Sequence, residues 1–454
     1  MLWLGYLASP PDRRSGHTVV NGFELPPDAS PAVVAAALDT LVARHESLRT
    51  TFHLPDDGEA FQVVHEPQPV PMTELVSDDD AEPLIAQAIA ELKAVAFDLA
   101  EPGMVRATLV LIGTRPVHLL VAAHHVVVDG WSWGVLRREL DVLVHAHIEG
   151  VAPALPPVAW QPLDQAAAER SEQGRKGNAA ALRYWEHQLA MQPDRVLPGG
   201  ADGPSGKQHV AVLESSALAT ALTWLSARYR VVDSTLVLAA FGAVLGAVTG
   251  RERAIMMTMS SNRHSARTRD LVACLAQYTA VNLDLRGDPT FRELVNRAGA
   301  AVLTAYRHGH YDFQAMKALE REVADRRGVV FSQPAGVNFK RYADPPARTD
   351  AGPLPTPSTA DTRLDVVAVG GSCARGVVLL SVRPEPDNTT LELLCDGEAM
   401  APDEMAGLVR AMETLLLAGM ADPDLTLSAL PALAGLHPPA PGADWALVDD
   451  CWVR

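Results

Sequence analysis

The chain has little cysteine, a shortage of positive charge and no long apolar run, and each shortage narrows what it can be. Four cysteines are scattered through 454 residues, too few for a disulfide framework, and none stands at metal-ligand spacing. This usage favours a reducing compartment, and we expect the protein to be cytoplasmic. The formal charge of −17 argues against a general nucleic-acid binder, which needs a basic surface.

We also expect neither a membrane segment nor a secretory signal. The longest apolar run, residues 235–248 (TLVLAAFGAVLGAV), is too short to cross a bilayer comfortably, so we predict that it is a buried core helix. The first residues, MLWLGYLASPP, are apolar but lack the basic segment of a signal peptide. No membrane partner is therefore expected.

A length of 454 residues is too great for one simple core and predicts two lobes. A proline-rich, polar stretch at 151–178 indicates a crossing between them. We place the first lobe at residues 1–170, the second at 178–430, and a proline-rich surface tail at 431–454.

Apolar periodicity predicts the elements of the first half. Residues 28–48 and 77–97 have helical spacing, and residues 61–66 are typical of a strand. Two apolar runs, 104–113 and 117–125, are separated by a short turn and predict a hairpin.

A further helix is predicted directly after this hairpin. Ser132 is the expected N-cap, because a serine hydroxyl can accept from the first free amides of a helix. The apolar face of this helix is formed by Leu136, Leu140, Leu143 and Val144.

The second half repeats this order of elements. Helical structure is expected to resume at 181–190, and strands are predicted at 364–370, 376–383 and 390–395. A helix at 402–418 comes next. Helices and hairpins mixed in each half predict an α+β fold.

The segment AAHHVVVDGWSWG, residues 122–134, is the strongest functional signal. Side chains alternate along a strand, so one of His124 and His125 can face a cavity while the other turns into the protein. Histidine titrates near neutral pH and is the usual general base. Asp129 can orient a histidine or hold the loop through an arginine, and Gly130 allows a tight turn before the helix.

This segment also has two interpretations that involve no general base. A single buried histidine is usually an ordinary core residue, although two histidines with Asp-Gly at fixed spacing rarely arise by chance. A metal site is disfavoured, because adjacent histidines rarely bind one ion and no third ligand stands at helical spacing. We predict no bound metal.

HHVVVDG (124–130) resembles the HHxxxDG motif of nonribosomal peptide synthetase condensation domains, relatives of CoA-dependent acyltransferases such as chloramphenicol acetyltransferase. ARHESLRTTF (43–52) is similar to the family's RHExLRTxF segment. Looser similarities occur in the family's order over almost the whole chain: MLWLGYL (1–7), ALRYWEHQLA (181–190), the segment 234–263, LVACLAQYTAVNLDL (271–285) and RHGHYDFQAM (307–316).

The resemblance implies an α+β fold of two chloramphenicol-acetyltransferase-like lobes, arranged as a V-shaped pseudo-dimer with a central tunnel. It implies partners as well: peptidyl or acyl carrier proteins that dock at the two mouths of the tunnel. The phosphopantetheine arm is supplied by the carrier, so no intrinsically bound cofactor is expected.

The resemblance also assigns roles to residues. By position in the motif, His125 is the catalytic histidine and His124 packs inward. Asp129 is structural and is expected to form a salt bridge with Arg263, at the end of the segment that matches the family's "pvagR". Removing one partner of such a buried pair costs roughly 3–5 kcal/mol.

Two further residues are expected near the tunnel. Gln277 stands where the family's IGxFVNTLxLR loop has a glycine, so this loop departs from the family pattern. Asn338, in AGVNFK (335–340), either lines the tunnel or makes a structural hydrogen bond.

The implied reaction is a condensation. An amine or hydroxyl, on a small molecule or on a carrier, attacks a carrier-bound thioester and forms an amide or an ester. His125 either accepts the nucleophile's proton or positions the nucleophile and stabilises the oxyanion. No adenylation or carrier sequence follows, so we expect a free-standing enzyme or one excised from a larger synthetase.

Two alternative functions belong to the same family. Ser132 and Trp133 resemble the HHxxxDGxSW form of epimerisation domains, but the chain lacks their EGHGRE-like segment. A non-catalytic recruiting module is the other alternative; such members have lost the second histidine or the aspartate, and this chain keeps both.

Overall fold

The computed structural model describes residues 16–55, 60–197, 204–205, 208–332, 334–340, 350–369, 373–374, 377–396, 399–436, 446–448 and 451–453. MLWLGYL (1–7) and much of the predicted tail, including 437–445, lie outside the described residues. The chain divides into a first unit, residues 1–174 with 261–276, and a second unit, residues 175–260 with 277–454.

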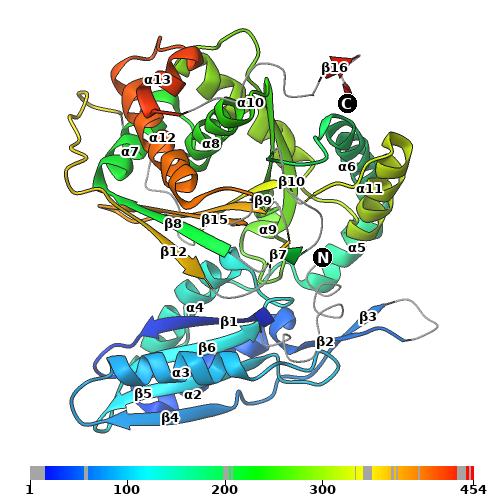
Figure 1. Cartoon of the computed structure of the whole chain (residues 1–454). Helices are drawn as coiled ribbons and strands as arrows, with labels where there is room; N and C mark the ends of the chain where they lie inside the picture. Colours follow the sequence, from blue (N-terminus) through cyan, green and yellow to red (C-terminus); the bar gives the residue numbers. More distant parts are fainter. Residues whose placement is uncertain are drawn as a thin grey trace. The chain divides into compact units, whose positions relative to one another are not determined.

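The first unit is built on a four-stranded sheet in the order β1-β6-β5-β4 (Figure 1). Its strands are β1 (Thr18–Glu24), β4 (Met72–Ser77), β5 (Val105–Ile112) and β6 (Arg115–His124). β5 and β6 form the predicted hairpin, and β1 pairs antiparallel with β6. β4 runs parallel to β5 at the edge of the sheet.

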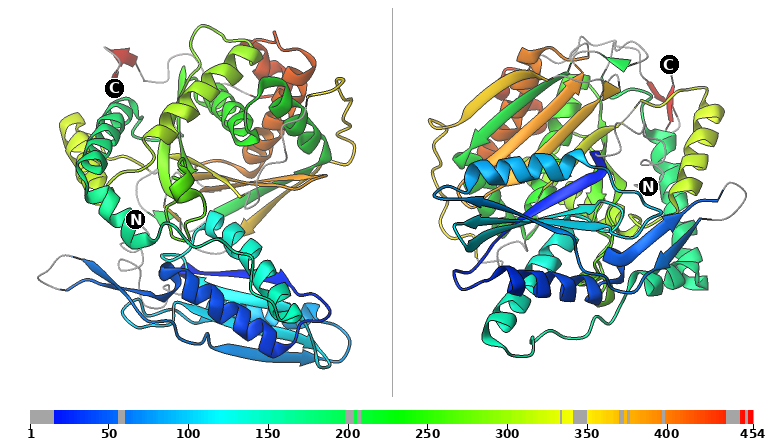
Figure 2. Two further views of the ribbon diagram at one scale, coloured as in Figure 1. Left: turned by 180° about the vertical axis from the view of Figure 1, so that it is seen from behind. Right: turned by 90° about the horizontal axis from the view of Figure 1, so that it is seen from below.

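Helices cover both faces of this sheet, because the apolar residues of its central strands alternate. Leu109 of β5 and Leu119 of β6 pack with α2 and α4, whereas Val110 and Leu120 pack with α3. Figure 2 shows this layering from below. The helices of the unit are α2 (Pro31–Arg44), η2 (Glu46–Arg49), α3 (Glu82–Ala94), α4 (Gly130–Glu149), α5 (Pro162–Arg170) and α9 (Ala266–Arg269). A separate ribbon pairs β2 (Thr50–His53) with β3 (Phe61–Val64).

The second unit has a seven-stranded sheet in the order β10-β9-β11-β14-β15-β8-β12. These strands are β8 (Gln208–Ser215), β9 (Arg253–Ser260), β10 (Gln277–Asp284), β11 (Ala335–Phe339), β12 (Arg363–Val369), β14 (Val378–Pro384) and β15 (Thr389–Asp396). Its helices are α6 (Glu172–Met191), α7 (Ser216–Tyr229), α8 (Asp233–Thr249), α10 (Phe291–Arg307), α11 (Phe313–Arg327), α12 (Pro402–Ala421), η3 (Leu427–Ala429) and α13 (Leu430–Ala434). Two short strand pairs also belong to this unit: β7 (Pro204–Ser205) with β13 (Cys373–Ala374), and β16 (Ala446–Val448) with β17 (Cys451–Val453).

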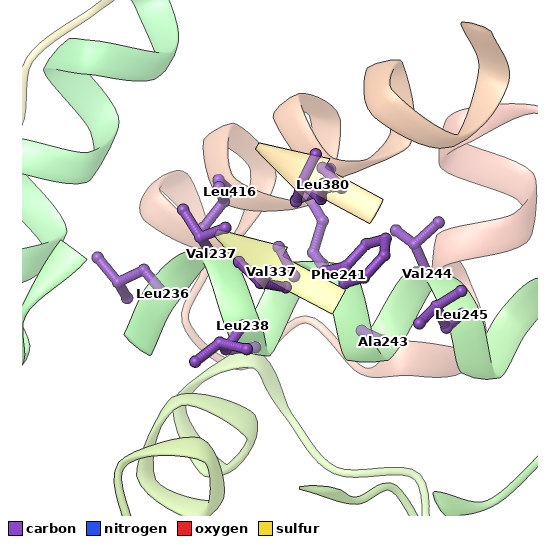
Figure 3. Close-up of a cluster of buried hydrophobic side chains, with 14 of the residues drawn as sticks. Leu236, Val237, Leu238, Phe241, Ala243, Val244, Leu245, Val337, Leu380 and Leu416 are labelled. Carbon is purple, nitrogen blue, oxygen red and sulfur yellow. The ribbon is translucent and has the colours of Figure 1, made fainter. Parts of the chain in front are cut away.

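The core of the second unit surrounds α8, which is buried over most of its length. Figure 3 shows Val237 and Phe241 of α8 among Val337 of β11, Leu380 of β14 and Leu416 of α12. The prediction of a buried core helix at 235–248 is therefore confirmed. Among the described residues no single helix is long and apolar enough to span a membrane; α7 and α8 pass only together, as a pair bent by 107°.

Three boundaries differ from those expected from the sequence. The predicted helix at 77–97 begins only at Glu82, because residues 72–77 form β4, whose pairing with β5 the sequence pattern does not reveal. The crossing at 151–178 contains α5 and the start of α6. α5 begins at Pro162, which suits the first turn of a helix. The segment 261–276, which lies within the predicted second lobe, belongs to the first unit.

Candidate active site

The sheet of the first unit places the two motif histidines. His124 is the last residue of β6, and Thr18 of β1 is paired with it. His125 comes next, and its backbone N–H donates to the carbonyl of His17 at 2.9 Å, which extends the ladder by one bond. The backbone of His125 is thus fixed by the sheet even though the residue lies beyond the strand.

The imidazole of His125 is held in one tautomer. Its Nδ1 lies 2.8 Å from the carbonyl oxygen of Val128. A carbonyl only accepts, so Nδ1 carries the proton and Nε2 keeps its lone pair. Within the described part of the chain, nothing hydrogen-bonds to Nε2. His125 is therefore oriented from behind, with its basic nitrogen available.

His124 has a different environment and faces inward, as its alternation with His125 requires. Its side chain is fully buried, it stacks on His17 at 5.8 Å between ring centroids, and Phe97 contacts it edge-on. Burial, with smaller contributions from His17 and His125, lowers the pKa of His124 to about 3. Its Nδ1 accepts from the backbone N–H of Val126 at 3.0 Å, which tightens the loop. His124 is thus a neutral, structural histidine.

Asp129 lies at the centre of a buried hydrogen-bond network. Its Oδ2 accepts from Arg263 Nη1 at 2.7 Å and from the backbone amides of Leu275 at 3.0 Å and Ala276 at 3.2 Å. The side chains of Asp129 and Arg263 are 2% and 0% exposed. Water does not screen a pair this deeply buried, and the additional hydrogen bonds offset its desolvation. The structure therefore contains the Asp129–Arg263 ion pair that the family resemblance implies.

The prediction that Ser132 caps α4 is wrong. Asp129 is the N-cap, with an extended backbone at φ −120° and ψ −179°, and α4 begins at Gly130. Ser132 instead donates, through both its N–H and its hydroxyl, to Asp129 Oδ1 at 2.9 Å. Asp and Ser are both good capping residues, and sequence alone does not rank them here. Gly130 lies outside the left-handed region, so the turn before α4 does not depend on a positive φ.

Arg263 fixes the segment 261–276 against the histidine loop. Its Nη2 donates to the carbonyl of Ala273 at 2.9 Å and to that of Leu271 at 3.2 Å. Cys274 lies beside this anchor, with its sulfur 4.0 Å from His125 Nδ1. Burial, then the nearby Asp129 carboxylate, raises the pKa of the Cys274 thiol, so Cys274 is a neutral neighbour of His125.

The two residues expected near a tunnel lie in the second unit. Gln277 is the first residue of β10, and its Nε2 donates to the carbonyl of Tyr311 at 2.9 Å. Its Oε1 lies 3.4 Å from the N–H of Tyr311, so the amide bonds to that backbone. Asn338 is a partly buried residue of β11, opposite Ser381 of β14. The lining role of both residues stays a prediction.

The RHES segment supports the first unit rather than the reaction. Arg44 and His45 both bond to the carboxylate of Glu139 on α4, each at 2.9 Å. These bonds, opposed by burial, lower the pKa of Glu139 to about 2. They join the end of α2 to α4 below the histidine loop. Among the described residues no group of three or more metal-ligand side chains gathers at one point.

Sequence reasoning does not find several residues of the site. Val128 contributes only its carbonyl, and Leu275 and Ala276 contribute only backbone amides, so no residue type reveals them. His17 stands far from any motif and reaches the site through the pairing of β1 with β6. Cys274 belongs to no motif, and in the sequence it is only one of four scattered cysteines.

The fold and the site together define an α+β protein in which a rigid loop presents one histidine. A family model described as Condensation domain matches residues 13–349. A linear gramicidin synthase of Brevibacillus parabrevis contains a polypeptide that is 32% identical over 289 residues, which are 62% of this chain and 4% of that polypeptide. The chain belongs to the condensation-domain family, and the prediction of that family is confirmed.

Solved structures agree on the fold. A structure on condensation domain-mediated chain release from the enacyloxin polyketide synthase has a TM-score of 0.71 and 22% identity, over 93% of this chain and 81% of that one. The X-domain from teicoplanin biosynthesis has a TM-score of 0.66 and 24% identity, over 94% and 95%. The α+β prediction is confirmed by these likenesses. The chain spans between 4% and 24% of the length of three curated relatives that it matches.

Proposed function

We propose that this chain catalyses a condensation between an acyl thioester on a carrier protein and an amine or hydroxyl acceptor. The nucleophile attacks the thioester carbonyl, a C–N or C–O bond forms, and the C–S bond breaks. The proton lost by the nucleophile goes to the departing thiolate. The products are an amide or an ester and a free thiol on the carrier's phosphopantetheine arm.

The observation that carries this proposal is the bond from His125 Nδ1 to the Val128 carbonyl at 2.8 Å. It leaves Nε2 as the basic nitrogen, which is what a general base needs. A hydroxyl acceptor requires this base, because its proton must leave as the C–O bond forms. A neutral amine needs less help, and His125 then acts mainly by positioning it.

Asp129 and Arg263 support this histidine without touching the reacting atoms. The pair fixes the loop that bears His125, and the Asp129 carboxylate also caps α4. A catalytic group has to be held within a fraction of an ångström, and a buried network of this kind achieves that.

The test is a condensation assay with the purified chain. Donors are an aminoacyl and a polyketide-type acyl thioester on carrier proteins, since the similar proteins include both a peptide synthase and a polyketide synthase domain. Acceptors are a panel of amines and alcohols, and products are identified by mass spectrometry. We expect His125→Ala to lower the rate by about 10²–10⁴-fold. His147→Ala, an exposed histidine on α4, is the matched control and should keep the full rate.

Two results would overturn the proposal. One is the absence of any new bond with every donor and acceptor, which would favour a recruiting module. The other is a His125→Ala variant as fast as the native chain. Epimerised donor without a new bond would instead indicate an epimerisation domain.

A further inference from the structure

A pocket of about 230 Å³ lies within the first unit and borders the histidine loop. Val126, the neighbour of His125 in the chain, lines it, and so does Cys274, whose sulfur lies 4.0 Å from His125 Nδ1. The pocket therefore shares a wall with the candidate catalytic residue. The proposed condensation, as far as His125 carries it, does not use this pocket.

The walls of this pocket are held in place from three sides. Ser47 donates to the carbonyl of Val127 at 2.5 Å, which ties η2 to the histidine loop. Gln161, at the start of α5, donates to the carbonyl of Arg44 at 2.8 Å and accepts from the N–H of Glu46 at 3.3 Å. The third wall, residues 273–275, is fixed through Asp129 and Arg263. Such a pocket is preformed, as ligand sites usually are.

The volume sets the size of what fits. An engineered cavity of about 150 Å³ is large enough to bind benzene. A pocket of about 230 Å³ accommodates one ring with a substituent, or an aliphatic group of similar size. Its apolar lining includes Phe52, Pro162, Ala166 and Leu275, which suits such a group.

The polar lining sets the chemistry. The hydroxyl hydrogens of Ser47 and Thr50 are donated to the backbone, so their oxygens are left as acceptors. Gln165 donates to Glu169 at 2.8 Å and orients that carboxylate at the exposed rim. The described residues that line the pocket include no lysine, arginine or histidine. The lining thus offers acceptors and negative charge to a ligand.

We propose that this pocket is a substrate subsite for a ring-sized side group that carries a hydrogen-bond donor, hydroxyl or amine, and no negative charge. The inference deepens the proposed function, because it names the class of substrate that reaches His125. A carboxylate in the same position would face Glu169 and would find no cation among the described lining residues.

Direct binding tests this subsite without any turnover. The full chain is titrated with benzylamine, phenol and benzoate, which share one ring and differ in the substituent, and binding is followed by ligand-observed NMR. We expect benzylamine and phenol to compete for one site, and benzoate to bind at least about tenfold more weakly. Equal binding of benzoate would overturn the inference.

Variants place the binding in the pocket. Ala166→Trp fills it and should abolish binding of both ligands, whereas Ala167→Trp, one residue along α5, points elsewhere as an exposed position outside the lining and should not. Glu169→Gln keeps the shape at an exposed site and should weaken benzylamine by up to about fivefold while sparing phenol. Unchanged benzylamine affinity in Ala166→Trp, or in Glu169→Gln should the first variant not fold, would refute the subsite.

The condensation assay separates this inference from the proposed function. In the native chain, substrates with an aryl-amine or phenol side group should react faster than their methyl counterparts, and Ala166→Trp should remove that preference. Product formation with no such preference refutes the subsite and leaves the function standing. Specific binding of the probes without any product supports the subsite and refutes the function.

Discussion

At the scale of single residues, the site depends on one carboxylate with five hydrogen bonds. Asp129 accepts from Arg263, Ser132, Leu275 and Ala276, so it joins the start of α4 to the segment 261–276. The position of His125 depends on this network as well as on its own bonds. The motif marks the carboxylate, but the number of partners is visible only in the structure.

We expect Asp129→Ala and Arg263→Ala each to lower the free energy of unfolding by about 3–5 kcal/mol, because each leaves a buried charge without its partner. The double variant should cost clearly less than the sum. Urea unfolding of the three variants measures this. Asp270→Ala is the control: Asp270 pairs with Arg138 of the same helix α4, but at 66% and 58% exposure, so it should cost less than about 1 kcal/mol. Strictly additive costs for Asp129 and Arg263 would contradict the pairing.

Glu139 makes the stability of the protein sensitive to acid. Its pKa is about 2 in the folded chain and 4.5 as the ordinary value, so its stabilisation is fully present above pH 4.5 and is lost as the pH falls towards 2. Between pH 7 and pH 3 the loss should be about 2 kcal/mol. The difference in unfolding free energy between the native chain and Glu139→Gln, measured at both pH values, should shrink by that amount. A difference that is the same at both would contradict this assignment.

At the scale of elements, the sequence predicts well those that depend on local periodicity. The hairpin of β5 and β6, the strands β12, β14 and β15 and the helix α12 all occur close to their predicted positions. β4 escapes prediction because its pairing with β5 is a tertiary contact, and the cap of α4 is misassigned because two good capping residues stand three apart. The role of Val128 is beyond reach, since any residue has a carbonyl.

The packing of α12 offers a matched pair of glycines. A Cβ at Gly419 would lie 2.2 Å from the ring of Phe291 on α10, whereas a Cβ at Gly407, on the same helix, meets nothing within 4 Å. Gly419→Ala should therefore cost about 1–3 kcal/mol through overpacking. Gly407→Ala should be neutral or stabilise by up to about 1 kcal/mol, because alanine favours a helix. Thermal unfolding of both variants decides, and equal shifts would show that α12 does not need the close approach.

At the scale of the whole molecule, two units could be expected from length alone, and two are found. Their boundaries could not, because the chain leaves the second unit after β9, contributes residues 261–276 to the first, and returns at β10. The motif resemblance anticipates the link between Asp129 and Arg263. It does not show that the whole segment around Arg263 packs with the first unit.

This excursion of the chain has a consequence for anyone who would dissect or recombine the protein. A fragment cut once, after residue 174, carries Asp129 without the arginine and the two backbone amides that neutralise it. The excised piece would retain the histidine motif letter for letter and still lack the clasp that shapes it. An exchange of catalytic halves between relatives must therefore transplant two stretches of sequence, not one.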